Sequence, residues 1–111
     1  MNISGQCHCG AISFTATASP ELVIACHCTD CQTISGAAFR AVLPVPVDQV
    51  VLVGVPKQYV KVAASGNRRV QAFCGECGTQ LFATEASEPK DLNIRLGCVN
   101  ERALLKPTVQ V

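Results

Sequence analysis

The sequence predicts a small, mostly β fold built from antiparallel strands. Short runs of β-branched residues alternate apolar and polar side chains, and turn-forming residues separate these runs at close intervals. No sustained stretch places apolar residues at helical spacing. Because 111 residues is the usual size of one domain, we expect residues 1–111 to form a single domain.

Eight strands are expected in chain order. The first, over residues 11–17, places Ile12, Phe14 and Ala16 on one face. The others are expected over residues 22–25, 38–43, 50–53, 59–62, 69–73, 80–84 and 92–96. The turns expected between strands are Pro44-Val45-Pro46, Gly54 and Ser65-Gly66-Asn67.

One helical turn is expected, over residues 29–35. Thr29 and Asp30 are residue types that cap helices, so either could accept a hydrogen bond from the backbone of the first turn. Strand pairing is therefore expected to supply most of the backbone hydrogen bonds of the fold.

Charge and composition exclude several classes of function. A net charge of +1 and the absence of Trp offer neither a basic surface for phosphates nor a stacking platform for bases, so no nucleic-acid partner is expected. No apolar run approaches the roughly 20 residues that cross a bilayer, so no membrane partner is expected. The first residues lack the pattern of a secretory signal, and we expect a cytoplasmic protein.

Seven of the eight cysteines fall in three groups. In chain order these are Cys7 and Cys9, then Cys26, Cys28 and Cys31, then Cys74 and Cys77. In a reducing compartment such groups favour metal binding over disulfides. Glycine directly after a cysteine pair lets the backbone fold back around the metal with φ > 0, and Gly10 and Gly78 stand in these positions.

The first and last groups together supply four thiolates, which is the number that closes a structural zinc site. Because Cys9 and Cys74 are far apart in the chain, such a site would remove the entropy of a long loop from the unfolded state. The alternative interpretation is two disulfide or reactive pairs.

The middle group supplies three thiolates, one fewer than a tetrahedral zinc ion requires. It is either a structural site closed by Cys98 or a histidine, or a catalytic site with one position open to substrate. His8 and His27 each stand between two cysteines, and alternation along the chain is expected to turn their rings away from the sulfurs. Cys98 stands alone between apolar residues and is expected to be a small buried residue.

Four arginines, at positions 40, 68, 69 and 95, stand in predicted strands or beside them. They could pair with acidic side chains or receive a ligand that carries a carboxylate. The sequence alone does not show which of the four arginines has which role.

Three motifs resemble a known family when taken together. They are Gly5-x-Cys7-x-Cys9-Gly10-x-Ile12-x-Phe14, Cys26-His27-Cys28-x-x-Cys31 followed by Gly36 and Phe39, and Phe73-Cys74-x-x-Cys77-Gly78-Thr79-x-Leu81. In order and spacing they resemble the glutathione-dependent formaldehyde-activating enzyme family, also called the Gfa or centromere protein V family. The resemblance extends from about residue 5 to residue 97.

The resemblance implies an Mss4-like, zinc-containing fold with two zinc ions per chain. It implies a structural zinc at Cys7, Cys9, Cys74 and Cys77, and a catalytic zinc at Cys26, Cys28 and Cys31. The implied activity is that of a carbon–sulfur lyase of the S-(hydroxymethyl)glutathione synthase type, which adds glutathione or a similar thiol reversibly to formaldehyde or a related aldehyde. The partners would be small molecules, the thiol and the aldehyde.

The sequence departs from the family at several positions. Gln32 and Gln71 stand where many relatives are expected to have arginine, and Cys98 replaces a commoner Thr or Ser. Relatives usually continue beyond the position that matches Val111, and these extra residues could form part of the substrate pocket. In this chain a homodimer could complete the pocket in their place.

Two other functions fit parts of the sequence. The chain could be a non-catalytic, zinc-stabilised binding module of the Mss4-like type. It could also be a redox protein that resembles methionine-sulfoxide reductases and uses Cys98.

Overall fold

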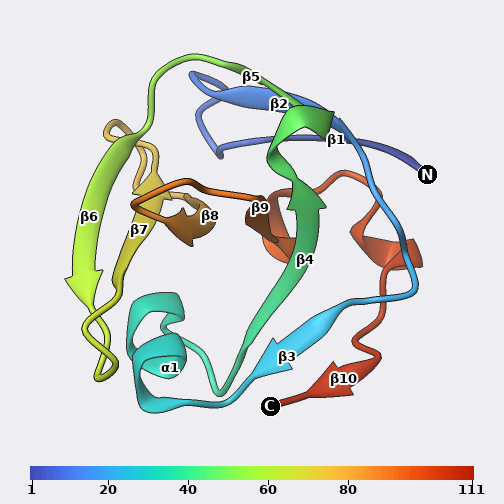
Figure 1. Ribbon diagram of the computed structural model, residues 1–111. Coiled ribbons are helices and arrows are strands. Elements are labelled where there is room, and N and C mark those ends of the chain that lie inside the picture. Colours follow the sequence, from blue (N-terminus) through green and yellow to red (C-terminus); the bar gives the residue numbers. More distant parts are fainter.

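The computed structural model describes residues 1–111 and is mostly β, which confirms the predicted fold class. The strands form two sheets, one with the order β1-β2-β5 and a larger one with the order β10-β3-β4-β9-β8-β7-β6. In Figure 1 the smaller sheet lies at the top of the molecule and the single α-helix, α1, lies at the bottom, next to β3. None of the helices has the length and apolar character of a membrane-spanning segment.

The smaller sheet is entirely antiparallel. It contains β1 (Asn2–Gln6), β2 (Ser13–Thr17) and β5 (Val50–Val53). The alternation expected in β2 is confirmed, because Phe14 and Ala16 are buried while Thr15 and Thr17 are exposed. β1 was not expected from the sequence, since one of its two buried positions is Gly5, which offers no apolar side chain.

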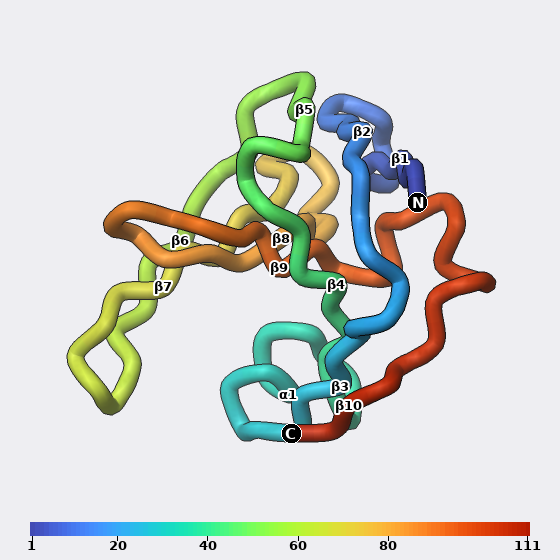
Figure 2. Tube along the Cα trace, turned by 45° about the vertical axis from the view of Figure 1, so that its right-hand side comes forward, coloured from blue at the N-terminus to red at the C-terminus, as the bar shows by residue number.

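The larger sheet is antiparallel except where the C-terminal strand joins it parallel to β3. Its strands are β3 (Ile24–Cys26), β4 (Arg40–Pro46), β6 (Lys57–Val62), β7 (Arg68–Phe73), β8 (Gln80–Glu85), β9 (Asp91–Arg95) and β10 (Val109–Gln110). All eight predicted strands are present. β10 was not expected, and Figure 2 shows it beside β3 at the end of the molecule where α1 lies.

The expected turn at Pro44-Val45-Pro46 is wrong, because these residues belong to β4. Leu43 and Val45 are fully buried, so the strand is held by its apolar face. β3 pairs with β4 only as far as Val42, which leaves β9 as the sole neighbour of β4 at both prolines. A strand edge of this kind tolerates residues that lack an N–H group.

The helix α1 (Thr29–Ser35) has the predicted bounds, but its predicted cap is wrong. The N-cap is Cys28, whose Sγ accepts a hydrogen bond from the backbone N–H of Cys31 at 3.4 Å, and neither Thr29 nor Asp30 fills this role. Gly36 ends the helix in the left-handed conformation. Three short 3-10 helices complete the fold: η1 (Val47–Gln49), η2 (Leu96–Cys98) and η3 (Arg102–Leu104).

One cluster of 18 buried residues joins the two sheets. Most of its members are aliphatic, and Phe14 and Phe82 are its only aromatic residues. Three cysteines, Cys7, Cys74 and Cys98, belong to this core. The core therefore reaches the loops that carry the first and last cysteine groups.

Candidate metal centres

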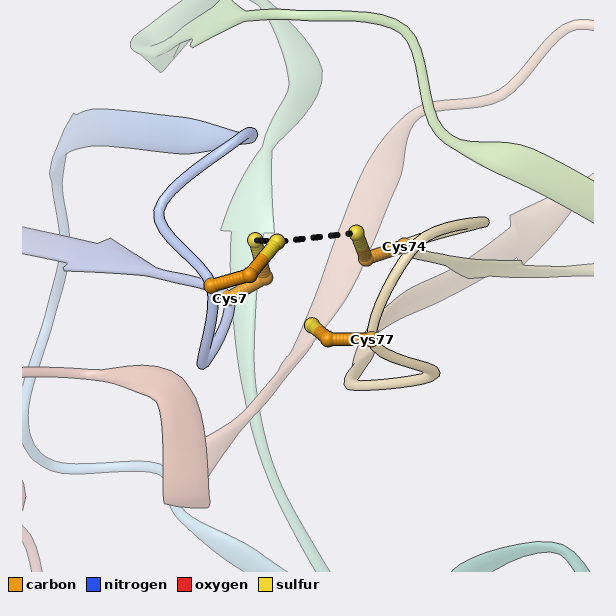
Figure 3. Close-up of side chains that lie close together, drawn as sticks. Cys7, Cys74 and Cys77 are labelled. Carbon is orange, nitrogen blue, oxygen red and sulfur yellow. Dashed lines mark hydrogen bonds between the residues drawn. The ribbon is translucent and has the colours of Figure 1, made fainter.

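The loop between β1 and β2 meets the turn between β7 and β8, and each brings two cysteines (Figure 3). The Sγ atoms of Cys7, Cys9, Cys74 and Cys77 all lie within 4.8 Å of one another. The Sγ of Cys9 is 3.7 Å from that of Cys7 and 3.7 Å from that of Cys74. Four sulfurs at 2.3 Å from a tetrahedral zinc ion would be about 3.8 Å apart, so the group fits this ion.

Backbone geometry around the four-cysteine group has the form that the glycines predict. Gly10 and Gly78 have φ values of 81° and 79°, in the left-handed region. The amide of Gly78 donates to the carbonyl of Cys74 at 2.9 Å, which closes the turn. The amides of Ile12 and Glu76 donate to the sulfurs of Cys7 and Cys74 at 3.3 Å and 3.4 Å. Such hydrogen bonds stabilise thiolates and orient them toward a metal.

The four cysteines differ in exposure. Cys7 and Cys74 are each 1% exposed and pack in the core, while Cys9 and Cys77 are exposed. Several hydrogen bonds lower the pKa of Cys77 to about 5, and the largest effect comes from the contact between its Sγ and the Oγ1 of Thr79, 3.2 Å apart. These contacts therefore favour the thiolate form of Cys77, which is the form that binds a metal.

The second group lies at the junction of β3 and α1. Cys26 ends β3, Cys28 caps α1 and Cys31 lies in its first turn, with all three Sγ atoms within 4.8 Å of one another. The hydrogen bond from the amide of Cys31 lowers the pKa of Cys28, which is exposed. Burial raises the pKa of Cys31 to about 12. The exposed member of the group is thus the one whose thiolate is favoured.

Cys98 and both histidines lie outside the two groups. Cys98 is 6% exposed and its Sγ donates to the carbonyl of Arg95 at 3.1 Å, which confirms the burial expected for it. Burial raises the pKa of Cys98 to about 11. His8 and His27 are exposed, and the ring of His27 contacts Gln110 and Phe39. The second group therefore has three protein sulfurs.

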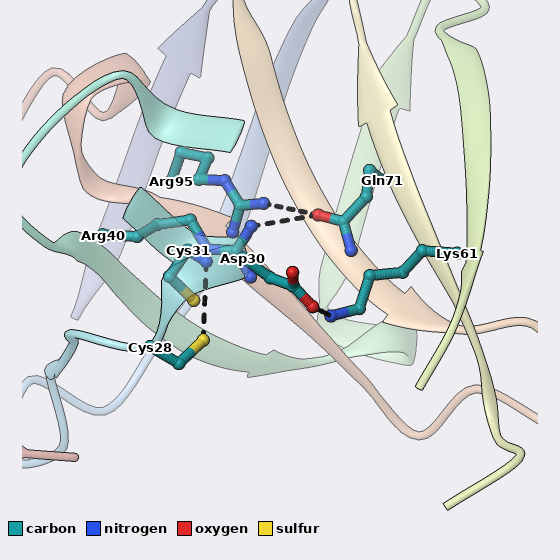
Figure 4. A network of polar contacts seen from close by, with 7 residues as sticks. All are labelled: Cys28, Asp30, Cys31, Arg40, Lys61, Gln71 and Arg95. Atoms are coloured by element: carbon teal, nitrogen blue, oxygen red, sulfur yellow. Dashed lines mark hydrogen bonds and ion pairs between the residues drawn. The ribbon is translucent and has the colours of Figure 1, made fainter. Parts of the chain in front are cut away.

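Two of the four arginines lie beside the three-cysteine group (Figure 4). Arg40, at the start of β4, and Arg95, at the end of β9, both donate to the Oε1 of Gln71, at 3.1 Å and 2.8 Å. Burial lowers the pKa of Arg95 to about 10, and the neighbouring charge of Arg40 adds to this effect. The other two arginines differ, because Arg69 forms an ion pair with Glu85 and Arg68 is exposed.

Both Arg40 and Arg95 line a cavity of about 620 Å³. The last turn of α1 contributes Ile34 and Ser35, and the turn that follows Cys77 contributes Gly78 and Thr79. The cavity is thus in contact with segments from both cysteine groups. The sequence contains no signal for it, because its walls come from strands whose order in the sheet is not encoded locally.

The comparisons with known proteins agree with this geometry. The sequence model of the family described as "Glutathione-dependent formaldehyde-activating enzyme" matches residues 2–111. A crystal structure of a Rhodobacter sphaeroides protein superimposes with a TM-score of 0.73, at 18% sequence identity, over 97% of this chain and 99% of that chain. At this identity the second match shows a shared fold. The mostly β architecture and the two cysteine groups are consistent with the predicted Mss4-like fold class.

Proposed function

The chain belongs to the glutathione-dependent formaldehyde-activating enzyme family, and from this premise we propose that it adds glutathione, or a similar thiol, reversibly to formaldehyde or a related aldehyde. The activity is that of a carbon–sulfur lyase of the S-(hydroxymethyl)glutathione synthase type. One observation carries the proposal: a complete four-cysteine group lies in the same small fold as a three-cysteine group that has no fourth protein ligand. A closed site is typical of structural zinc, and a site with an open position is typical of catalysis.

Two zinc ions are part of the proposal. Cys7, Cys9, Cys74 and Cys77 would hold the structural ion, and soft thiolate ligands at tetrahedral spacing favour zinc. Cys26, Cys28 and Cys31 would hold the second ion and are the proposed catalytic residues. When bound there, zinc would lower the pKa of a thiol at the open position and polarise an aldehyde carbonyl.

The residues of the chain contribute binding and position. A free thiol with a pKa near 8.5 is only a few per cent thiolate at neutral pH, so a site that favours its ionised form raises the population that can react. The sulfur attacks the carbonyl carbon, a C–S bond forms, the C=O π electrons move to oxygen, and the thiol proton ends on that oxygen to give a hemithioacetal. The adjoining cavity would hold both reactants together, which is where most of the rate gain would arise.

The reaction also proceeds without a catalyst, so its rate must be compared with that of buffer. Exchange between free formaldehyde and its glutathione adduct can be followed by NMR with ¹³C-labelled formaldehyde. We expect the zinc-loaded protein and its Cys98→Ser variant to accelerate this exchange, and the Cys28→Ser variant to leave it at the rate of buffer. Equal rates for all three proteins and for buffer would exclude the proposed activity.

The redox alternative is not favoured by the environment of Cys98. A reactive thiol needs exposure and a lowered pKa, whereas Cys98 is buried and its pKa is raised to about 11. No specific contact favours the non-catalytic binding module. We therefore propose a single zinc-binding domain over residues 1–111 that acts on a small-molecule thiol and an aldehyde in the cytoplasm, where a reducing environment keeps thiolates available.

A further inference from the structure

Two guanidinium groups lie inside the molecule without a carboxylate partner. Arg95 is 5% exposed, and Arg40 lies beside it in a partly buried position. Both hydrogen-bond to the same neutral acceptor, the Oε1 of Gln71, and neither forms an ion pair within the chain (Figure 4). The hydrogen bonds to Gln71 therefore leave both positive charges uncompensated.

Several of their donor atoms also lack an acceptor. The Nε and Nη1 of Arg95 and the Nε of Arg40 are buried and have no hydrogen-bond partner in the chain. A buried charged group without a partner is strongly unfavourable, so proteins seldom keep one that serves only the fold. Arg95 and Arg40 both line the cavity of about 620 Å³, which lies within the range of roughly 300–1,000 Å³ typical of small-molecule sites.

The nearby acidic and thiolate groups do not neutralise this charge. Asp30, on α1, pairs with Lys61 instead (Figure 4). Three thiolates and one divalent ion at the three-cysteine group would carry a single net negative charge, against two positive charges on the arginines. Against this group alone one positive charge remains, and one bound carboxylate would neutralise it.

We propose that Arg95 and Arg40 bind a carboxylate of the substrate in this cavity. A guanidinium group is a strong donor to carboxylates, and the Nε and Nη1 of Arg95 are two donors from which no group of the chain accepts. The inference rests on the proposed function, because it defines which thiols or aldehydes the site accepts. The carboxylate could belong to the thiol, as in glutathione, or to the aldehyde, as in glyoxylate.

Binding can be measured without any reaction. S-Methylglutathione keeps both carboxylates of glutathione but can neither form the adduct nor ionise at sulfur, and its dimethyl ester lacks the carboxylates. Calorimetric titration of the zinc-loaded chain with these two compounds, with glyoxylate and with formaldehyde separates the two sources. The variants are Arg95→Met and Arg40→Met, with Arg68→Met as the control, because Arg68 is exposed and its replacement removes the same charge.

We expect at least one carboxylate probe to bind and its affinity to fall about tenfold or more in Arg95→Met, with no change in Arg68→Met. Binding of S-methylglutathione but not of its ester assigns the carboxylate to the thiol, and binding of glyoxylate but not of formaldehyde assigns it to the aldehyde. The inference is overturned if neither carboxylate probe binds, or if Arg95→Met binds them like the unmodified chain.

The melting temperature of the variant gives a second readout. Removal of an unpaired buried charge should leave the melting temperature of the ligand-free protein unchanged or raise it. Removal of an arginine that stabilises the fold would lower the melting temperature. If Arg95→Met does not fold, Arg40→Met carries the same test. Because S-methylglutathione forms no adduct, loss of the proposed activity with retained binding would refute the function and leave this inference standing.

Discussion

Cys9 and Cys74 stand 65 positions apart in the chain, and their Sγ atoms lie 3.7 Å apart. This contact ties the loop between β1 and β2 to the turn between β7 and β8. The core around it is built mainly of aliphatic side chains, which bury less area than large aromatic ones. A metal ion at this point would act as a cross-link that adds stability the core does not supply.

Replacement of an exposed ligand of the four-cysteine group should therefore unfold the protein. Structural zinc sites contribute about 10–16 kcal/mol of binding free energy, and whole domains are stable by only about 5–15 kcal/mol. We expect Cys9→Ser to lose one zinc ion and its cooperative thermal transition. Metal analysis measures the first loss, and thermal melting monitored by circular dichroism measures the second. A variant that melts like the unmodified chain would contradict a structural role for this group.

The three-cysteine group should behave differently, because it closes a loop of only six residues, Cys26 to Cys31. We expect Cys28→Ser to lose one zinc ion and the adduct-forming activity while its melting temperature falls by only a few degrees. The measurement is the same pair of experiments. Unfolding of this variant would mean that the second site is structural.

The buried thiol of Cys98 predicts a loss of stability in alkali. Its pKa is about 11 in the folded chain against a reference value of 9.0, so the folded state holds its proton more tightly than the unfolded state. The contribution is fully present below pH 9 and is lost as the pH rises toward 11. Two pH units correspond to about 2–3 kcal/mol at most.

Comparison of the unmodified chain with Cys98→Ala isolates this effect from the other thiols. The free energy of unfolding, measured with urea from pH 8 to pH 11, should fall more steeply for the unmodified chain than for Cys98→Ala. Parallel curves would show that Cys98 ionises as easily in the folded state as in the unfolded state.

Gly5 lies against η2 and cannot take a side chain. A Cβ at this position would lie 2.2 Å from the carbonyl oxygen of Cys98 and 2.3 Å from the ring of Phe14. We expect Gly5→Ala to destabilise the fold by about 2 kcal/mol or more, since backbone would have to move. Gly97→Ala is the matched control, because nothing lies within 4 Å of its Cβ. Equal midpoints of urea unfolding for the two variants would contradict the close approach.

Local patterns account for the parts of the structure that the sequence predicts. The alternation of Ile12, Phe14 and Ala16 marks β2, and the glycines after the cysteine pairs mark the turns of the four-cysteine group. Both signals act within a few residues, so no knowledge of the sheet is needed to interpret them.

The remaining features depend on contacts between distant segments. β10 consists of only Val109 and Gln110 and exists because β3 has a free edge. Arg40 and Arg95 can both donate to Gln71 only because β4, β9, β8 and β7 lie side by side in that order. No local sequence pattern predicts this order. Cys28 caps α1 through its Sγ, and cysteine is not among the residue types that usually cap helices, so residue preferences alone select the wrong cap.

The metal content of the purified chain, determined by native mass spectrometry together with elemental analysis, tests the central claim most directly. The account predicts two zinc ions in the unmodified chain, one in folded Cys28→Ser, and two in Cys98→Ser. A chain that carries no metal, or whose cysteines are joined as disulfides, would contradict it.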